Sequence, residues 1–166
     1  MIPGVDLSSL EVHEDERGRL VEMFRAARYP DTFRQANHSR SRKGVLRGLH
    51  YHRRQADLWY VIEGRAQAAL VDLRTRHDGP AVETLVLDGD EPAALYIPTG
   101  VAHGFAALTD LDLVYWVTRE YDPGDEHGIA WNDPMLKVPW EISDPVLSPR
   151  DVNNPPFRWD TIPSFS

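Results

Sequence analysis

Short β-strand patterns separated by turn residues run through most of this chain and restrict its fold more than any other feature. Apolar and β-branched residues form strand-like runs at residues 20–24, 58–62, 66–73, 82–87, 94–97 and 111–121. Turn-forming residues precede, separate or follow these runs, at positions 15–18, 64, 78–79, 88–89 and 98. This pattern predicts an all-β sandwich or barrel, and a closed jelly roll is favoured because it leaves no long exposed sheet edge.

Helical periodicity is confined to one short segment, about residues 29–36, with Asp31 as a candidate N-cap. The clearest strand is 111–121, where alternate residues are apolar or aromatic. We expect one face of this strand to point inward and to carry Leu111, Leu113, Tyr115, Val117 and Tyr121. Beyond residue 121 the chain is rich in Pro, Trp and Asn, which predicts ordered irregular structure packed on the barrel.

Length and composition indicate one globular domain. The 166 residues, 42% of them hydrophobic, suffice for a single core, so residues 1–166 are expected to form one domain. The net charge of −8 argues against nucleic-acid and membrane-surface partners, which require a basic field. The absence of cysteine excludes disulfides, zinc–thiolate sites and thiol nucleophiles. With no signal-peptide pattern and no long apolar run, we expect a cytoplasmic protein.

A basic, histidine-containing segment lies in the middle of this acidic chain. Residues 32–56 contain no Asp or Glu and seven Lys and Arg residues. His50 and His52 are two residues apart, so on a strand both rings point to the same face. Basic side chains beside an imidazole indicate a site for an anionic ligand such as a phosphate, although a charge cluster alone is more often a solvated loop.

Several distinctive motifs occur in order between residues 15 and 151: D-E-R-G, Q-A-N-H-S-R-S, G-V-L-R-G-L-H, V-D-L-R, I-P-T-G-V-A-H-G-F, G-I-A-W-N-D-P and S-P-R-D. Together they resemble the family of dTDP-4-dehydrorhamnose 3,5-epimerases and related nucleotide-sugar epimerases of the cupin superfamily. The resemblance implies a cupin-type jelly roll (a double-stranded β-helix barrel) with few short helices. It implies a cofactor-free isomerase of deoxysugar biosynthesis that forms a homodimer and inverts C3, C5 or both of a TDP-linked 4-keto-6-deoxyhexose.

The resemblance also implies roles for individual residues. His50 is the expected base that removes the proton next to the ketone, Asp151 orients its imidazole, and Tyr115 returns a proton from the opposite face of the sugar. Other matched positions are expected to bind the substrate: Arg17, Glu22, Gln35, Asn37, Arg47, His103 and Tyr121. The remaining histidines, His13, His38, His77 and His127, are expected to be surface or structural residues.

Two departures from the family pattern leave alternatives open. The family usually has Gln where this chain has His52, and Lys where it has Asp57, a change of charge that could restrict inversion to C3. The spacing of His50, His52 and Asp57, with His103, also fits a metal-dependent cupin in which these four residues bind Fe, Mn, Ni or Zn. A third hypothesis is a binding module without catalysis, if Asp57 has disabled the site.

Overall fold

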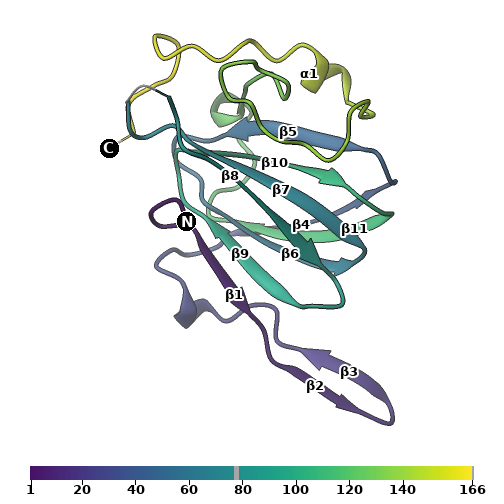
Figure 1. Ribbon diagram of the computed structural model, residues 1–166. Helices are drawn as coiled ribbons and strands as arrows, with labels where there is room; N and C mark the ends of the chain where they lie inside the picture. Colours follow the sequence, from purple (N-terminus) through teal and green to yellow (C-terminus); the bar gives the residue numbers. More distant parts are fainter. Residues whose placement is uncertain (77–78, 166) are drawn as a thin grey trace.

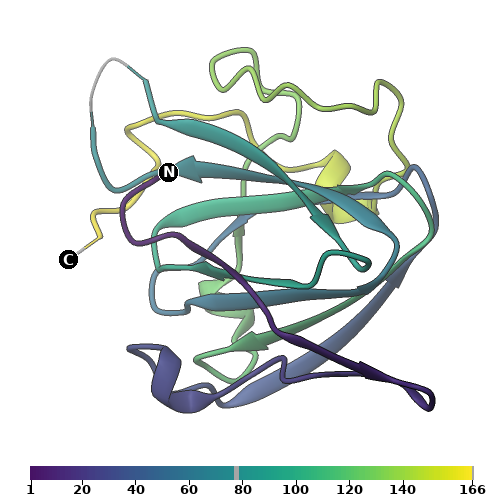
Figure 2. The same cartoon turned by 60° about the horizontal axis from the view of Figure 1, so that its bottom comes forward.

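Two antiparallel β-sheets packed face to face form the body of the protein (Figures 1 and 2). The computed structural model describes residues 1–76 and 79–165. The first sheet has the order β1 (Asp6–Ser9), β9 (Ala93–Ile97), β6 (Asp57–Glu63), β11 (Leu111–Val117) and β4 (Gln35–Ser41). The second has the order β12 (His127–Gly128), β5 (Leu46–Tyr51), β10 (Val101–Ala107), β7 (Arg65–Asp72) and β8 (Val82–Asp88).

Helices are few and short in the described residues: η1 (Ala26–Arg28), η2 (Pro123–Asp125) and α1 (Pro149–Val152). None of them has the length needed to cross a bilayer. A separate hairpin of β2 (Val12–Asp15) and β3 (Gly18–Val21) projects from the barrel (Figure 1). The predicted all-β jelly roll with few short helices is therefore confirmed.

The main core lies between the two sheets and contains residues of both. Trp59 and Leu113 face it from the first sheet, and Leu70 and Phe105 face it from the second. Tyr115 packs against this cluster, as the alternation in its strand predicts. Burying such side chains supplies the main favourable free energy of folding, of the order of 1.5–3 kcal/mol for each large apolar residue.

The outer faces of both sheets are also covered. The C-terminal segment packs on β5, β7 and β10 through Ile129, Leu136, Phe157 and Ile162, which confirms the predicted ordered irregular tail. On the other sheet, residues 23–33 pack against Tyr96 and Trp116. Both coverings stabilise the sheets, but the C-terminal one also carries α1 to the end of β5.

The predicted helix at 29–36 is wrong. Tyr29 and Phe33 instead pack their rings, with Phe24, on the outer face of the first sheet, and strand β4 begins at Gln35. Pairing with β11 outweighs a weak helical pattern that contains a Pro. The strand predicted at 20–24 already ends at Val21, and that predicted at 111–121 ends at Val117. The predicted turn at 78–79 includes Asp78, which lies outside the described residues.

Two glycines allow β5 and β10 to approach closely beside the histidines of the site. A Cβ at Gly48, whose φ is +131°, would lie 2.6 Å from the Cα of Gly104. A Cβ at Gly104 would lie 2.7 Å from the carbonyl oxygen of Arg47. Both contacts are with backbone atoms, so a side chain at either position requires the strands to separate.

We expect Gly104→Ala to lower the free energy of unfolding by about 2 kcal/mol, the usual cost of forcing extra volume into a packed core. Urea denaturation would measure it. Gly79→Ala is the matched control, because a Cβ there meets nothing within 4 Å, and it should change stability by less than about 0.5 kcal/mol. Equal stability of the two variants would contradict the steric argument.

Candidate active site

A cavity of about 280 Å³ opens between the two sheets at one end of the barrel. The first sheet contributes Asp57 and Tyr115, the second contributes His50 and His103, and the C-terminal segment contributes Asp151. A neighbouring groove of about 490 Å³ shares three residues with the cavity, namely His52, Tyr115 and Glu126. The site therefore has two adjoining compartments.

His50 forms a short polar contact in the cavity with Asp151. Its Nε2 lies 2.6 Å from Oδ1 of Asp151, across 101 residues of sequence. Ser148 caps α1 by accepting a hydrogen bond from the Asp151 backbone N–H, and its hydroxyl donates to Oδ2 of Asp151 at 2.9 Å. Ser148 is therefore the N-cap of α1, and Asp151, in the first turn of this helix, is the partner of His50 that the family resemblance predicts.

The environment keeps Asp151 ionised. Burial raises the pKa of its carboxyl group, but hydrogen bonds from His50 and Ser148, and the charge of Arg150, outweigh burial and lower the pKa below its usual value. Asp151 is 4% exposed and His50 22% exposed, so the carboxylate is buried behind an imidazole that still faces the cavity. This arrangement suits a base whose ring is held in one orientation.

His103 pairs directly opposite His50 on the neighbouring strand β10 and is buried. Its Nδ1 donates to the carbonyl oxygen of Val101 at 3.0 Å, and its ring lies edge-on to Trp59. Burial lowers the pKa of His103 to about 4, against the opposing effect of Asp57. His103 is therefore neutral at pH 7.

Arg47 and Tyr115 reach the cavity from opposite sheets. Arg47 donates through Nε to the hydroxyl of Ser41 at 3.1 Å. Burial raises the pKa of Tyr115, and the nearby carboxylate of Asp57 raises it further, while Arg47 opposes the shift. Tyr115 therefore keeps its phenolic proton at neutral pH.

The four residues of the metal hypothesis do not form one cluster. His50 is engaged by Asp151, whereas donor atoms of His52, Asp57 and His103 lie within 4.8 Å of one another. A four-ligand cupin site that includes His50 is thus not what the structure contains, and the similarities reported below also do not favour a metal-dependent cupin enzyme.

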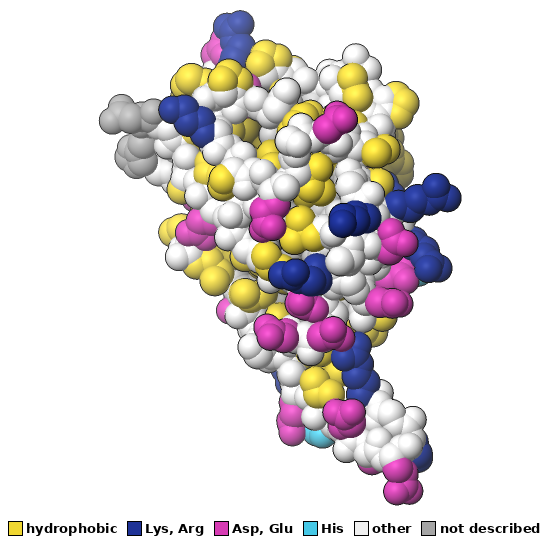
Figure 3. All heavy atoms as spheres, turned by 45° about the vertical axis from the view of Figure 1, so that its right-hand side comes forward, with side chains coloured by type: hydrophobic (Ala, Val, Ile, Leu, Met, Phe, Trp, Pro, Cys, Tyr) yellow, Lys and Arg dark blue, Asp and Glu magenta, His cyan; other side chains and the backbone are white. Residues whose placement is uncertain are grey.

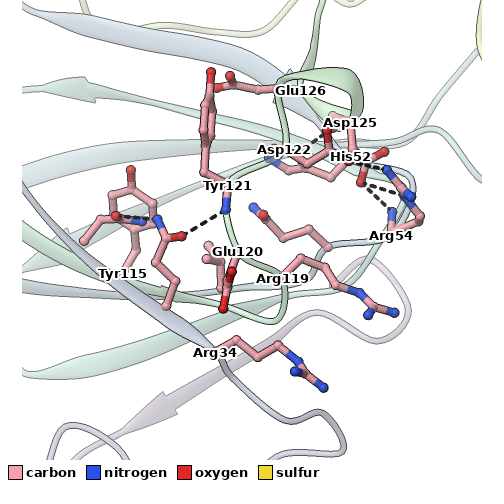
Figure 4. A pocket seen from close by; sticks show the side chains of 14 residues that line it. Arg34, His52, Arg54, Tyr115, Arg119, Glu120, Tyr121, Asp122, Asp125 and Glu126 are labelled. Atoms are coloured by element: carbon pink, nitrogen blue, oxygen red, sulfur yellow. Dashed lines mark hydrogen bonds and ion pairs between the residues drawn. The ribbon is translucent and has the colours of Figure 1, made fainter.

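Three of the predicted binding residues line the groove. Gln35 accepts a hydrogen bond from the Tyr121 backbone N–H at 2.9 Å and donates to Asn37 at 2.8 Å (Figure 4). Tyr121 lies beyond the end of β11 and is 67% exposed, so the prediction that it follows the strand alternation is wrong. It nevertheless borders the groove.

Arg17 and Glu22 do not line either compartment. Arg17 pairs with Asp15 in the hairpin turn, and Glu22 pairs with Arg25 just beyond the hairpin. Of the other histidines, His13 and His38 are exposed and His127 stacks on Tyr51, while His77 lies outside the described residues.

Sequence reasoning missed two contributions to the site. Arg119 extends along one side of the groove together with Arg34 and Arg54 (Figure 4). The buried Asp125 accepts hydrogen bonds from the backbone N–H groups of Arg53 and Arg54. Arg119 could have been found from the sequence, because it lies two positions after Val117 and so follows the same alternation. Nothing local in the sequence indicates the role of Asp125.

We expect His103 to make stability pH-dependent between about pH 4 and 6.5. In that window the unfolded chain binds a proton on His103 and the folded chain does not, so stability rises with pH by up to about 1.4 kcal/mol per pH unit. Denaturation of wild type and His103→Gln at several pH values would measure this. The stability difference should grow with pH to about 6.5 and then level off; a constant difference would contradict the burial argument.

Comparison of the sequence and the fold with known proteins identifies the family of this chain. The family described as dTDP-4-dehydrorhamnose 3,5-epimerase matches residues 1–158. The Escherichia coli dTDP-4-dehydrorhamnose 3,5-epimerase is 39% identical over 84% of this chain and 82% of its own length. A Legionella pneumophila 3,5-epimerase, solved with dTDP-4-keto-L-rhamnose, has a TM-score of 0.90 and 32% identity, covering 100% of this chain and 96% of that one.

A relative with narrower activity is also similar in structure. The 3'-monoepimerase ChmJ of Streptomyces bikiniensis, solved with dTDP-quinovose, has a TM-score of 0.85 and 31% identity over 92% of this chain and 83% of its own. Both kinds of relative have cupin-type jelly rolls, and the match extends over the strands that carry the histidines. From the cavity, the His50–Asp151 pair and these similarities together, we conclude that the chain belongs to the dTDP-4-dehydrorhamnose 3,5-epimerase family.

Proposed function

We propose that this epimerase inverts C3, C5 or both of a TDP-linked 4-keto-6-deoxyhexose, with His50 as the base and Tyr115 as the proton donor. The observation that supports this assignment most is the 2.6 Å contact of His50 with the buried Asp151, at the wall of a cavity that Tyr115 faces from the other sheet. The hydrogen on a carbon next to a ketone is weakly acidic, so its removal requires a base in contact and a stabilised enolate.

His50 can act as a base because only one of its ring nitrogens is bound to Asp151. Nε2–H donates to the carboxylate, which leaves Nδ1 with a lone pair for the substrate proton. As the imidazole becomes positively charged, the adjacent carboxylate stabilises it. Asp151 is therefore proposed as the residue that orients His50 and offsets its charge.

Tyr115 suits the complementary step. It belongs to β11 in the first sheet, whereas His50 belongs to β5 in the second, so the two side chains approach the cavity from different walls. Its raised pKa keeps it protonated until it donates. Removal of a proton on one side and addition on the other inverts the carbon.

The remaining cavity residues have electrostatic roles in this proposal. Arg47 brings a positive charge toward the developing enolate oxygen, and His103 offers a neutral imidazole for a hydrogen bond to the sugar. In the groove, Arg34 and Arg119 form no ion pair among the described residues and are available to a diphosphate, beside Gln35 and Asn37.

We expect His50→Ala to lose at least about a hundredfold in the rate at which deuterium from heavy water enters a TDP-4-keto-6-deoxyglucose substrate, because general-base catalysis usually contributes that much or more. Tyr115→Phe should still exchange hydrogen but invert poorly, since it retains the base and lacks the donor. NMR of the product measures both effects and identifies whether C3, C5 or both carry deuterium.

His38→Gln is the control for this experiment. His38 is exposed on the outer side of β4, where it contacts Asp112, and it lines neither compartment. It should exchange at the wild-type rate. Retained exchange in His50→Ala would assign the base to another residue, and binding of the nucleotide sugar without exchange in the wild type would favour a binding module.

We also propose that the chain forms a homodimer through its projecting hairpin. Figure 3 shows this hairpin as an arm that stands out from the body of the molecule and bears charged and apolar side chains. Leu20 is 67% exposed there, and Arg17 lies in its turn. The family resemblance implies that Arg17 contacts the nucleotide, although it does not line the groove of its own chain. Packing of the hairpin on a second copy would place Arg17 beside the groove of that copy.

Light scattering of the purified protein should therefore give a mass near twice the 18.9 kDa of the chain. We expect Leu20→Asp to shift the mass toward the monomer, because it introduces a charge into an apolar contact. Val152→Asp, at an equally exposed apolar residue of α1, is the matched control and should remain dimeric. A monomeric wild-type protein would overturn the proposal.

A further inference from the structure

Three side chains with potential metal-binding atoms converge in the cavity. None of them takes part in the proposed proton transfers. They are His52 just after β5, Asp57 at the start of β6, and His103 on β10. Their candidate ligand atoms all lie within 4.8 Å of one another. We propose that His52, Asp57 and His103 form a binding site for a divalent transition-metal ion such as Zn²⁺, separate from the base His50.

Both imidazoles are oriented for this purpose. Nδ1 of His52 lies 2.9 Å from the carbonyl oxygen of Asp125, and Nδ1 of His103 lies 3.0 Å from that of Val101. A carbonyl oxygen only accepts hydrogen bonds, so each Nδ1 carries the proton and each Nε2 keeps a lone pair. Metal-binding histidines commonly have this arrangement, in which the outer nitrogen is fixed by a backbone carbonyl.

Asp57 provides a negative charge that the surrounding protein does not neutralise. Its carboxylate is 3% exposed and accepts hydrogen bonds from Gln55 at 2.8 Å and, at a long 3.4 Å, from Trp59. Among the described residues no Lys or Arg forms an ion pair with it. Its nearest charged-type neighbour is Nε2 of His103, at 3.7 Å, the nitrogen that keeps a lone pair because Nδ1 donates to Val101. A carboxylate oxygen therefore faces a lone pair, and a cation between them would remove that repulsion.

The distances require only a small adjustment. Ligands bound at about 2.1 Å from a tetrahedral ion are roughly 3.5 Å apart, so the cluster must contract by about 1 Å. His52 is only partly buried, at the edge shared by the cavity and the groove, and its ring is the one with room to move. Two imidazole nitrogens and one carboxylate oxygen are a ligand set that suits Zn²⁺ and similar ions.

The site and the proposed base are compatible because they use different atoms. His50 is bound to Asp151 and takes no part in the cluster. If the proposed epimerisation is correct, a cation here would occupy Nε2 of His103 and replace its proposed hydrogen bond to the sugar with a Lewis-acid contact to an oxygen of the keto sugar. Metal binding itself does not depend on that reaction, so the two proposals can fail separately.

The test is a titration of untagged, chelator-treated protein with Co²⁺, followed by its visible absorption, and with Zn²⁺ by equilibrium dialysis. We expect one equivalent to bind, and we expect His52→Gln and Asp57→Asn each to weaken binding at least about tenfold, since each removes one of three ligands. Near-ultraviolet circular dichroism would verify that the variants are folded.

Two further variants make the result specific. His38→Gln removes an exposed imidazole beside Asp112, outside the cluster, and should bind as the wild type does. His50→Asn should also retain the metal, although it is expected to lose hydrogen exchange. The proposal is overturned if the wild type binds no stoichiometric metal, if Asp57→Asn binds as tightly as the wild type, or if His50→Asn abolishes binding.

Discussion

The hydrogen bond between His50 and Asp151 depends on the way the C-terminal segment packs on the barrel. Asp151 reaches the cavity because residues such as Phe157 and Ile162 bury their side chains against the outer face of the β5–β10–β7 sheet. The same packing carries Ser148, which caps α1 and holds the second carboxylate oxygen. The apolar packing of the C-terminal segment thus holds His50 and Asp151 at 2.6 Å. Without this packing, the proposed base would have no orienting partner.

Each sheet supplies a different part of the proposed chemistry. The second sheet contributes His50 and His103 on adjacent strands that the glycines at 48 and 104 allow to approach closely. The first sheet contributes Tyr115 from β11. A jelly roll brings the inner faces of two sheets together, so an acid and a base on opposite walls need no long loops to meet one substrate.

The inner cavity combines neutral imidazole with buried negative charge. Burial disfavours protonation of His103, and the buried carboxylate of Asp57 lies beside it without an Arg or Lys partner among the described residues. Asp57 stands where the resemblance to the family predicts a Lys, so the local charge is negative where a positive one was expected. The difference bears on how an enolate is stabilised here, either by Arg47 or by a cation at His52, Asp57 and His103.

The sequence by itself determined the all-β class, the inward face of Tyr115 and the family, because strand alternation and ordered motifs are local properties of the chain. It did not determine that residues 29–36 form no helix, that Tyr121 lies beyond its strand, or that Arg17 and Glu22 lie outside both compartments. Only the tertiary structure separated His50 from the cluster of His52, Asp57 and His103. Spacing along a strand fixes which face a side chain takes, whereas its partner depends on how segments a hundred residues apart pack together.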